Sequence, residues 1–79
     1  MNVFPNPVRD VLNVKIDTNG SKQVRIILTD LTGQQVLNFQ QNLSPGVNYL
    51  TLQNPGFRGM YILTVVADGP KINKRVIFE

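Results

Sequence analysis

The side chains that most often carry enzyme chemistry are scarce in this chain of 79 residues. It contains no His, no Cys and only five acidic residues, which are Asp10, Asp17, Asp30, Asp68 and Glu79. Acid–base and nucleophilic catalysis most often need His, Cys or paired carboxylates. No two of these acids share one face of an expected strand. The sequence therefore predicts a protein that is not an enzyme and has no catalytic residues.

Two kinds of ligand site are conceivable from the remaining residues, and an ordinary structural role is favoured for both. Asp17, Asn19 and Asp68 could offer oxygen ligands to calcium, but Asp and Asn are common turn residues. Aromatic side chains could form a platform for a sugar or a base, yet aromatics at strand spacing are more often core. These aromatics are Phe39, Tyr49, Phe57 and Tyr61. We therefore predict no metal site, no cofactor and no small-molecule substrate.

Length and composition indicate a single small domain over residues 1–79. Apolar residues make up 42% of the chain and charged residues 16%, which excludes a disordered tail and a membrane segment. The net charge of +3 comes from eight scattered Lys and Arg residues, without the basic blocks of nucleic-acid-binding arms. We therefore predict no nucleic-acid partner. Met1-Asn2 does not open like a signal peptide, so any export signal is expected elsewhere.

The elements that must position these residues are expected to be strands. The apolar run 59–67, which begins at Gly59 and ends before Asp68-Gly69-Pro70, is rich in β-branched and aromatic residues and is interpreted as the central strand. Residues 11–16 alternate between apolar and polar. Further strands are expected at 23–29, 34–40, 47–52 and 71–78, with residues 3–7 as an extended segment or edge strand. Turn signals about every 8 to 12 residues are typical of an antiparallel sandwich.

Three turn signals are specific enough to predict local structure. Asn19-Gly20 tolerates positive φ and predicts a hairpin between the strands on either side. Asp30 can accept a hydrogen bond from a nearby backbone N–H, and Gly33 can take positive φ. Residues 43–46, with the sequence Leu-Ser-Pro-Gly, predict another turn.

Alternation within the strands predicts which side chains form the core. We expect one buried set, composed of Leu12, Val14, Ile16, Val24, Ile26, Leu28, Leu50, Leu52, Tyr61, Leu63 and Val65. In the last strand we expect Val76 and Phe78 to face the core, and Arg75, Ile77 and Glu79 to face solvent. An apolar docking patch on the opposite faces should contain Ile27, Met60, Ile62, Val66, Val11 and Ile77. Because Val36 and Leu37 are adjacent, their strand carries a bulge or turns one of them outward.

Four segments carry a joint pattern that is more specific than any of them alone. They are Val3-Phe4-Pro5-Asn6-Pro7 followed by Val11-Leu12-Asn13-Val14, Asp30-Leu31-Thr32-Gly33-Gln34-Gln35-Val36, Gly59-Met60-Tyr61-Ile62-Leu63, and Lys74-Arg75-Val76-Ile77. Together they resemble the type A C-terminal sorting domain of substrates of the type IX (Por) secretion system of Bacteroidetes. The positions that carry the resemblance are Pro5, Asn6, Pro7, Asp30, Gly33, Gly59 and Tyr61.

The resemblance implies an immunoglobulin-like sandwich of about seven strands at the end of a larger secreted precursor. Its implied role is to direct an attached cargo across the outer membrane, in transit from the periplasm to the cell surface or the extracellular space. The implied partners are the outer-membrane translocon, its shuttle proteins, the upstream cargo domain and a sortase-type protease that cuts upstream of Val3. The residues that we propose for recognition are Lys74, Arg75, Val76, Ile77, Phe78 and Glu79.

A second class of function fits the same strand pattern, namely a generic adhesion or carbohydrate-binding sandwich of an extracellular enzyme. The sorting hypothesis places function at the free C-terminus and makes it portable to other cargo. The binding-module hypothesis instead predicts a ligand affinity that survives loss of the last residues. Deletion of residues 74–79 is expected to separate them. The identity of the cargo and the oligomeric state are left open.

Overall fold

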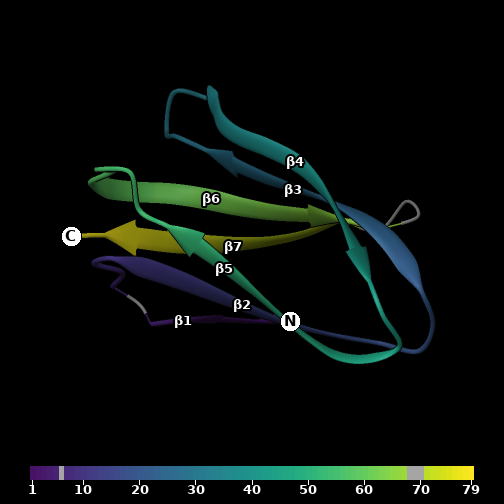
Figure 1. Cartoon of the computed structure of the whole chain (residues 1–79). Helices are drawn as coiled ribbons and strands as arrows, with labels where there is room; N and C mark the ends of the chain where they lie inside the picture. Colours follow the sequence, from purple (N-terminus) through teal and green to yellow (C-terminus); the bar gives the residue numbers. More distant parts are fainter. Residues whose placement is uncertain (6, 68–70) are drawn as a thin grey trace.

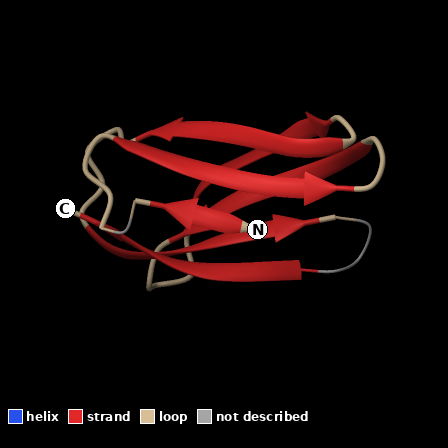
Figure 2. Ribbon diagram, turned by 90° about the horizontal axis from the view of Figure 1, so that it is seen from below, coloured by secondary structure: helices blue, strands red, loops and turns tan. Residues whose placement is uncertain are grey.

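The computed structural model describes residues 1–5, 7–67 and 71–79, and the regular structure within them is entirely β (Figures 1 and 2). Its strands are β1 (Asn2–Phe4), β2 (Val11–Thr18), β3 (Lys22–Thr29), β4 (Gln35–Leu43), β5 (Gly46–Gln53), β6 (Gly59–Val66) and β7 (Lys71–Phe78). No helix in this described part of the chain is long and apolar enough to cross a membrane.

The strands form two antiparallel sheets that face each other. One sheet has the order β1-β2-β5 and the other the order β4-β3-β6-β7. The chain crosses between the sheets from β2 to β3, from β4 to β5 and from β5 to β6, which is the Greek-key order of an immunoglobulin-like sandwich. The predicted fold class is therefore confirmed. The run interpreted as the central strand is β6, which lies inside the four-stranded sheet.

The core lies between the sheets and contains every side chain predicted for it. The buried hydrophobic residues are Val8, Leu12, Val14, Val24, Ile26, Leu28, Leu43, Leu63, Val65, Val76 and Phe78. The other predicted core residues are partly buried and pack against these, namely Ile16, Leu50, Leu52 and Tyr61. The inward orientation of Val76 and Phe78 is confirmed. Alternation did not predict Val8 and Leu43, because neither lies in a strand that the sequence pattern predicted.

The turn at Asn19-Gly20 is not the hairpin that was predicted. β2 pairs with β1 and β5, whereas β3 pairs with β4 and β6, so this turn carries the chain from one sheet to the other. β2 also continues through Thr18, whose buried hydroxyl donates to the carbonyl of Gly20 at 3.0 Å. The local turn preference is overridden because packing the apolar faces of β2 and β3 against each other buries both.

β4 and β5 both extend beyond their predicted bounds. β4 spans Gln35–Leu43 instead of ending near residue 40, and β5 begins at Gly46, whose φ is 98°. The predicted turn at 43–46 is therefore shorter than expected, and Leu43 is buried. Of the two alternatives predicted for Val36 and Leu37, a bulge or one outward side chain, the structure shows the bulge: β3 pairs with Leu37 and with Gln35, and Val36 between them has no partner residue in the ladder.

The outer face of the four-stranded sheet carries a diagonal apolar stripe. By register this stripe contains Ile27, Met60, Ile62, Val66 and Ile77. Met60 and Ile77 are exposed, and the other three are half-buried. Val11, which was predicted to join them, faces outward from the other sheet, where it pairs with Gln53. The prediction of one patch holding all six residues was therefore wrong for Val11.

Candidate functional site

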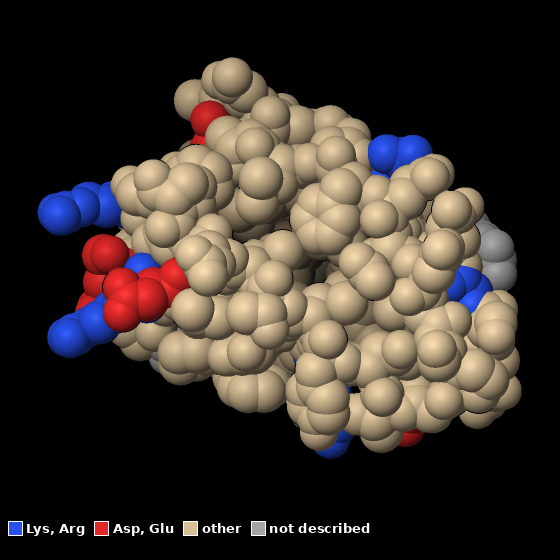
Figure 3. All heavy atoms as spheres, viewed as in Figure 1, with Lys and Arg blue, Asp and Glu red and all other residues tan. Residues whose placement is uncertain are grey.

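Most of the positions singled out by the sequence gather at the end of the sandwich where the chain ends (Figure 1). Gly59, at the start of β6, pairs with Phe78, at the end of β7. β3 ends beside the start of β6, so the turn at residues 30–33 lies at the same end. We call this region the C-terminal end. Charged side chains of both signs gather there, whereas the middle of the same face is uncharged (Figure 3).

A short strap, residues 8–10, covers the edge of β7 at the C-terminal end. The backbone N–H of Val8 donates to the carbonyl of Ile77 at 2.7 Å, and the N–H of Glu79 donates to the carbonyl of Val8 at 2.8 Å. The Val8 side chain is fully buried. Arg9 Nε also donates to Glu79 Oε2 at 3.0 Å, in an exposed ion pair that contributes at most about 1 kcal/mol. The last residues are therefore held mainly through their backbone.

Asn54 fastens this strap to the loop that precedes β6. Its backbone N–H donates to the carbonyl of Asp10 at 2.8 Å. Its side-chain Nδ2 donates to the carbonyls of Arg9 at 2.9 Å and Phe57 at 3.1 Å. Its Oδ1 accepts from the N–H groups of Gly56 at 3.0 Å and Phe57 at 2.6 Å. A single residue thus fixes the strap and the loop in one arrangement.

Asn54→Ala is expected to lower the free energy of unfolding by about 1–3 kcal/mol, because it leaves backbone groups of the strap and the loop without partners. Urea denaturation followed by circular dichroism measures this change. Asn42→Ala is the matched control, because the Asn42 side chain is exposed and makes no hydrogen bond within the described residues. The control should change stability by less than about 0.5 kcal/mol. Equal losses in both variants would contradict the fastening role.

Three aromatic side chains pack together beneath this network. The ring centroids of Phe57 and Tyr61 are 5.0 Å apart, and Phe78 lies 5.7 Å and 5.2 Å from them in edge-to-face contacts. Such pairs add about 0.5–1.5 kcal/mol each beyond area burial. Phe39 also packs against the core, whereas Tyr49 is 65% exposed on β5. The core role favoured for the four aromatics is therefore confirmed for Phe39, Phe57 and Tyr61 and was wrong for Tyr49.

The turn between β3 and β4 is built around the carboxylate of Asp30. Its Oδ1 accepts from the Thr32 hydroxyl at 2.6 Å and from the N–H groups of Thr32 and Gln34 at 2.9 Å and 3.0 Å. Gly33 donates its N–H to the Asp30 carbonyl at 3.1 Å and has a φ of 91°, which side-chain-bearing residues rarely adopt. Both predictions for this turn are confirmed.

These bonds make the turn sensitive to pH. The hydrogen bond from the Thr32 hydroxyl lowers the pKa of Asp30, burial raises it in opposition, and bonds from the N–H groups of Gln34, Thr32 and Gly33 lower it further. Because the folded pKa lies below the unfolded value of about 3.9, the stabilisation is complete above that value. It is lost as the pH falls through the folded pKa.

We expect the Asp30 carboxyl in the folded domain to titrate at a lower pH than in an unfolded peptide covering residues 29–35. Carbon-13 NMR of the side-chain carboxyl measures both midpoints. Thr32→Val should move the folded midpoint upward, because it removes the hydroxyl donor and keeps the side chain's shape. Coincident midpoints in the folded domain and the peptide would contradict this prediction.

The six residues proposed for recognition differ in burial. Val76 is 1% exposed and Phe78 is 4% exposed, so both belong to the core. The exposed members are Lys74, Arg75, Ile77 and Glu79. A partner that meets the folded domain can therefore contact the side chains of the four exposed residues but not those of the two buried ones.

The prolines flank a shallow hollow beside the chain end. Pro5 and Pro7 are exposed and line this hollow of about 570 Å³ with four further residues, namely Arg9, Asp10, Val11 and Glu79. Asn6 lies outside the described residues. Of the calcium ligands considered, Asp17 is the second-last residue of β2 and Asn19 directly follows the strand, whereas Asp68 lies outside the described residues, as do Gly69 and Pro70. The described residues contain no cluster of three acidic, His or Cys side chains that could hold a metal.

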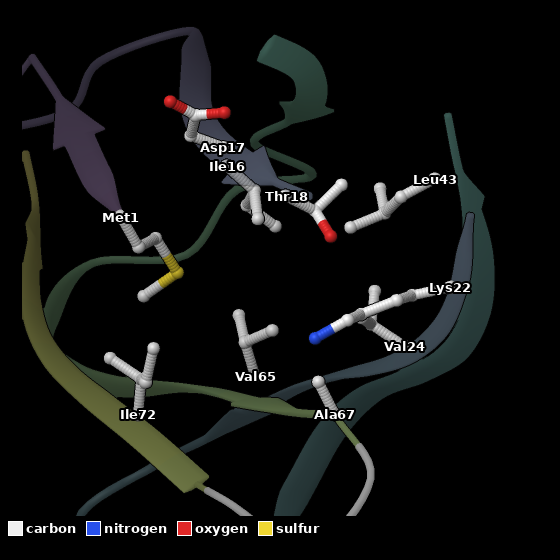
Figure 4. A pocket seen from close by; sticks show the side chains of 10 residues that line it. All are labelled: Met1, Ile16, Asp17, Thr18, Lys22, Val24, Leu43, Val65, Ala67 and Ile72. Carbon is white, nitrogen blue, oxygen red and sulfur yellow. The ribbon is translucent and has the colours of Figure 1, made fainter. Parts of the chain in front are cut away.

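A second hollow, shown in Figure 4, lies at the opposite end of the sandwich, where β2 ends and β3 and β7 begin. It measures about 200 Å³ and is mainly apolar, with Met1, Ile16, Val24, Leu43, Val65, Ala67 and Ile72 among its lining residues. Lys22 extends its ammonium group toward this hollow, whereas the Asp17 carboxylate turns away from it (Figure 4). None of the motif positions that the structure describes lines it, so the candidate site remains the C-terminal end.

Sequence reasoning missed the two residues that organise the site. Val8 stands alone between Pro7 and two charged residues, so no alternation marks it as core. Asn54 precedes Pro55-Gly56. The side chain of an Asn in a turn often accepts a hydrogen bond from the backbone N–H two residues further along the chain. That signal could have predicted the bond to Gly56, but nothing local predicts the bonds from Asn54 to the strap.

In a comparison with protein families, a family model matches residues 2–79. The matching family is described as a secretion system C-terminal sorting domain. No curated protein matches the chain, and no solved structure matches it. The match spans both sheets and includes every segment that carried the resemblance.

Proposed function

The chain belongs to the family of type IX secretion C-terminal sorting domains, and from this membership we propose that it directs an attached cargo across the outer membrane. The family implies a secreted protein of Bacteroidetes that passes to the cell surface or the outside. We propose that the domain is the last part of a larger precursor and crosses the periplasm on its way. The observation that carries the proposal is the family match over residues 2–79.

Recognition is proposed to use the exposed residues among the last six, namely Lys74, Arg75 and Ile77 of β7 and Glu79, which follows it. Their geometry supports this role, because the strap and the core fix the backbone of residues 77–79 while these side chains stay in solvent. Because the backbone that carries these side chains is already fixed, less conformational entropy is lost when a partner binds them. The proposed partners are the outer-membrane translocon and its shuttle proteins.

Removal by a sortase-type protease is proposed to occur upstream of Val3. Two features of the fold support a cut there. β1 is a short outer strand of three residues, and Met1 lines the hollow at the end opposite the C-terminal end. A protease acting there would approach the domain away from the residues proposed for recognition. The domain itself is proposed to have no catalytic role, as suits a sorting signal.

The proposal is tested with a fluorescent cargo fused to this domain in a type IX-competent bacterium that exports the cargo from the cytoplasm. We expect the fusion to reach the cell surface or the medium, while the cargo alone stays in the periplasm. Equal retention of both would contradict a sorting function. Binding of the isolated domain to a glycan array, combined with retention of the fusion, would favour the adhesion or carbohydrate-binding module.

Substitution of the four exposed residues is expected to abolish export without unfolding the domain. The variant combines Lys74→Ser, Arg75→Ser, Ile77→Ser and Glu79→Ser, and leaves Val76 and Phe78 in place. The control combines Lys15→Ser, Lys22→Ser, Val47→Ser and Asp17→Ser, which changes similar side chains on β2, β3 and β5. Circular dichroism checks that both fold. Normal export of the first variant would show that recognition uses another surface.

A further inference from the structure

The edge of β7 is open over its first half. The strap bonds to the carbonyl of Ile77 and the N–H of Glu79, so the odd-numbered residues of this strand direct their backbone groups away from β6. By the same alternation, the backbone groups of Lys71, Asn73 and Arg75 point outward at the sheet edge. No other described segment pairs with them. An open edge of this kind is a template for another strand.

Positive charge surrounds this open edge. β7 contains Lys71, Lys74 and Arg75 and no acidic residue. All three side chains are exposed, and none of them forms an ion pair within the described residues. Lys71 and Arg75 lie on the outer face, whereas Lys74 lies on the inner face opposite Leu63. The edge therefore presents cations on both faces of any strand added to it.

These charges decide which strand can add. Cations on an edge strand protect against pairing with a second copy, because like charges would then meet across the new ladder. The outer strand β4, Gln35–Leu43, carries no charge at all and lacks this selectivity. An acidic strand would be attracted to β7 where a second copy would be repelled. The edge of β7 is thus distinguished from that of β4 by charge.

Around Ile72 the inner face beside the edge is apolar, and Lys74 lies next to Ile72 on that face. Ile72 is 44% exposed and lines the 200 Å³ hollow together with Met1 and Val65 (Figure 4). An added strand would place every second side chain next to Ile72 on this face and the others next to Lys71 and Arg75 on the outer face. The site therefore suits a strand whose apolar and acidic residues alternate.

We propose that the β7 edge from Lys71 to Arg75 binds an extended segment of a partner protein in which apolar and acidic residues alternate. The segment adds as a fifth strand to the sheet β4-β3-β6-β7. This inference rests on the proposed function for the origin of the partner, the secretion machinery, but its test is a binding measurement that needs no export. A negative binding result would therefore not contradict the proposed function, and a failure of export would not contradict strand addition.

The test uses a short fluorescent peptide in which Val and Glu alternate, and a control peptide in which Val and Lys alternate. Fluorescence anisotropy measures binding to the domain, and NMR chemical shifts map it. We expect the Glu peptide to bind, to shift the resonances of residues 71–75, and to weaken as salt is added. We expect the Lys peptide to bind at least about tenfold more weakly.

A variant at Asn73 tests the backbone contact. Asn73→Pro removes an N–H that points away from β6, so the β6–β7 ladder keeps its bonds. We expect its Kd for the Glu peptide to rise roughly tenfold, which corresponds to about 1.4 kcal/mol. Asn73→Ala is the matched control. Like the proline variant, it removes the Asn73 side-chain oxygen that accepts a hydrogen bond from the Thr64 hydroxyl at 2.7 Å, but it keeps the backbone N–H of residue 73.

A charge variant tests the proposal independently of the proline. The double variant Lys71→Glu and Arg75→Glu should reverse the preference between the two peptides. Several outcomes would overturn the proposal: no binding of the Glu peptide, equal binding of both peptides, or shifts confined to β4 or the outer stripe. Equal affinities of Asn73→Pro and Asn73→Ala, or a concentration-dependent dimer of the domain that uses this edge, would overturn it as well.

Discussion

Leu63→Ala is expected to lower the free energy of unfolding by about 2–5 kcal/mol. Leu63 lies on the inner strand β6, is completely buried and stands between Leu28 of β3 and Lys74 of β7 in the sheet. The substitution loses transfer free energy and leaves a cavity that neighbours on two strands can fill only in part. The total free energy of unfolding of a small domain is about 5–15 kcal/mol, so this one substitution removes a large share of it.

Urea denaturation of the wild type and the variant measures the loss. Leu31→Ala provides a control with identical chemistry, because Leu31 is 70% exposed in the β3–β4 turn. The control should alter stability by less than about 0.5 kcal/mol. A loss below about 1 kcal/mol for Leu63→Ala would mean that β6 is not the centre of the core.

The inward face of each strand could be predicted from the sequence, because inward side chains recur at every second residue of a strand. Leu12 and Val14 on β2, and Ile26 and Leu28 on β3, alternate with polar or less buried residues, and burial of one face then fixes the orientation of the whole strand. The Asp30–Gly33 turn was equally predictable, because its hydrogen bonds are all local.

The pairing of strands could not be predicted in the same way. Asn19-Gly20 predicts a hairpin, but the energy that decides between a hairpin and a sheet crossing comes from contacts across the sandwich. Leu43 illustrates the same limit, since its burial depends on β4 continuing past the predicted end of the strand. Local signals specify turns, whereas the assignment of strands to sheets depends on non-local burial.

The candidate site depends still more on distant contacts. Val8 is buried only because its backbone bonds to the last strand, about seventy residues further along the chain. Asn54 contacts the same strap from a third segment. The sequence predicted the residues of the last strand but not the strap that holds them, because no pattern within residues 8–10 indicates a contact with residues 77–79.

Deletion of residues 74–79 is expected to unfold the domain. The deletion removes the buried side chains of Val76 and Phe78 and exposes Val8 and Tyr61. Loss of a buried Phe alone costs about 3–5 kcal/mol, and loss of the Val adds about 1.5–3 kcal/mol. The sum approaches the whole stability of a small domain, so the β signal in circular dichroism and the cooperative urea transition should both disappear.

This expected result changes how the C-terminal residues must be tested. A truncated fusion that fails to export would report loss of the fold as readily as loss of a signal, so deletion cannot separate sorting from ligand binding. Side-chain substitution can separate them, since Lys74, Arg75, Ile77 and Glu79 are exposed and the strap holds residues 77–79 through backbone bonds. A truncated domain that still unfolds cooperatively would instead show that Val76 and Phe78 are dispensable for the core, and the deletion would then become the direct test of recognition.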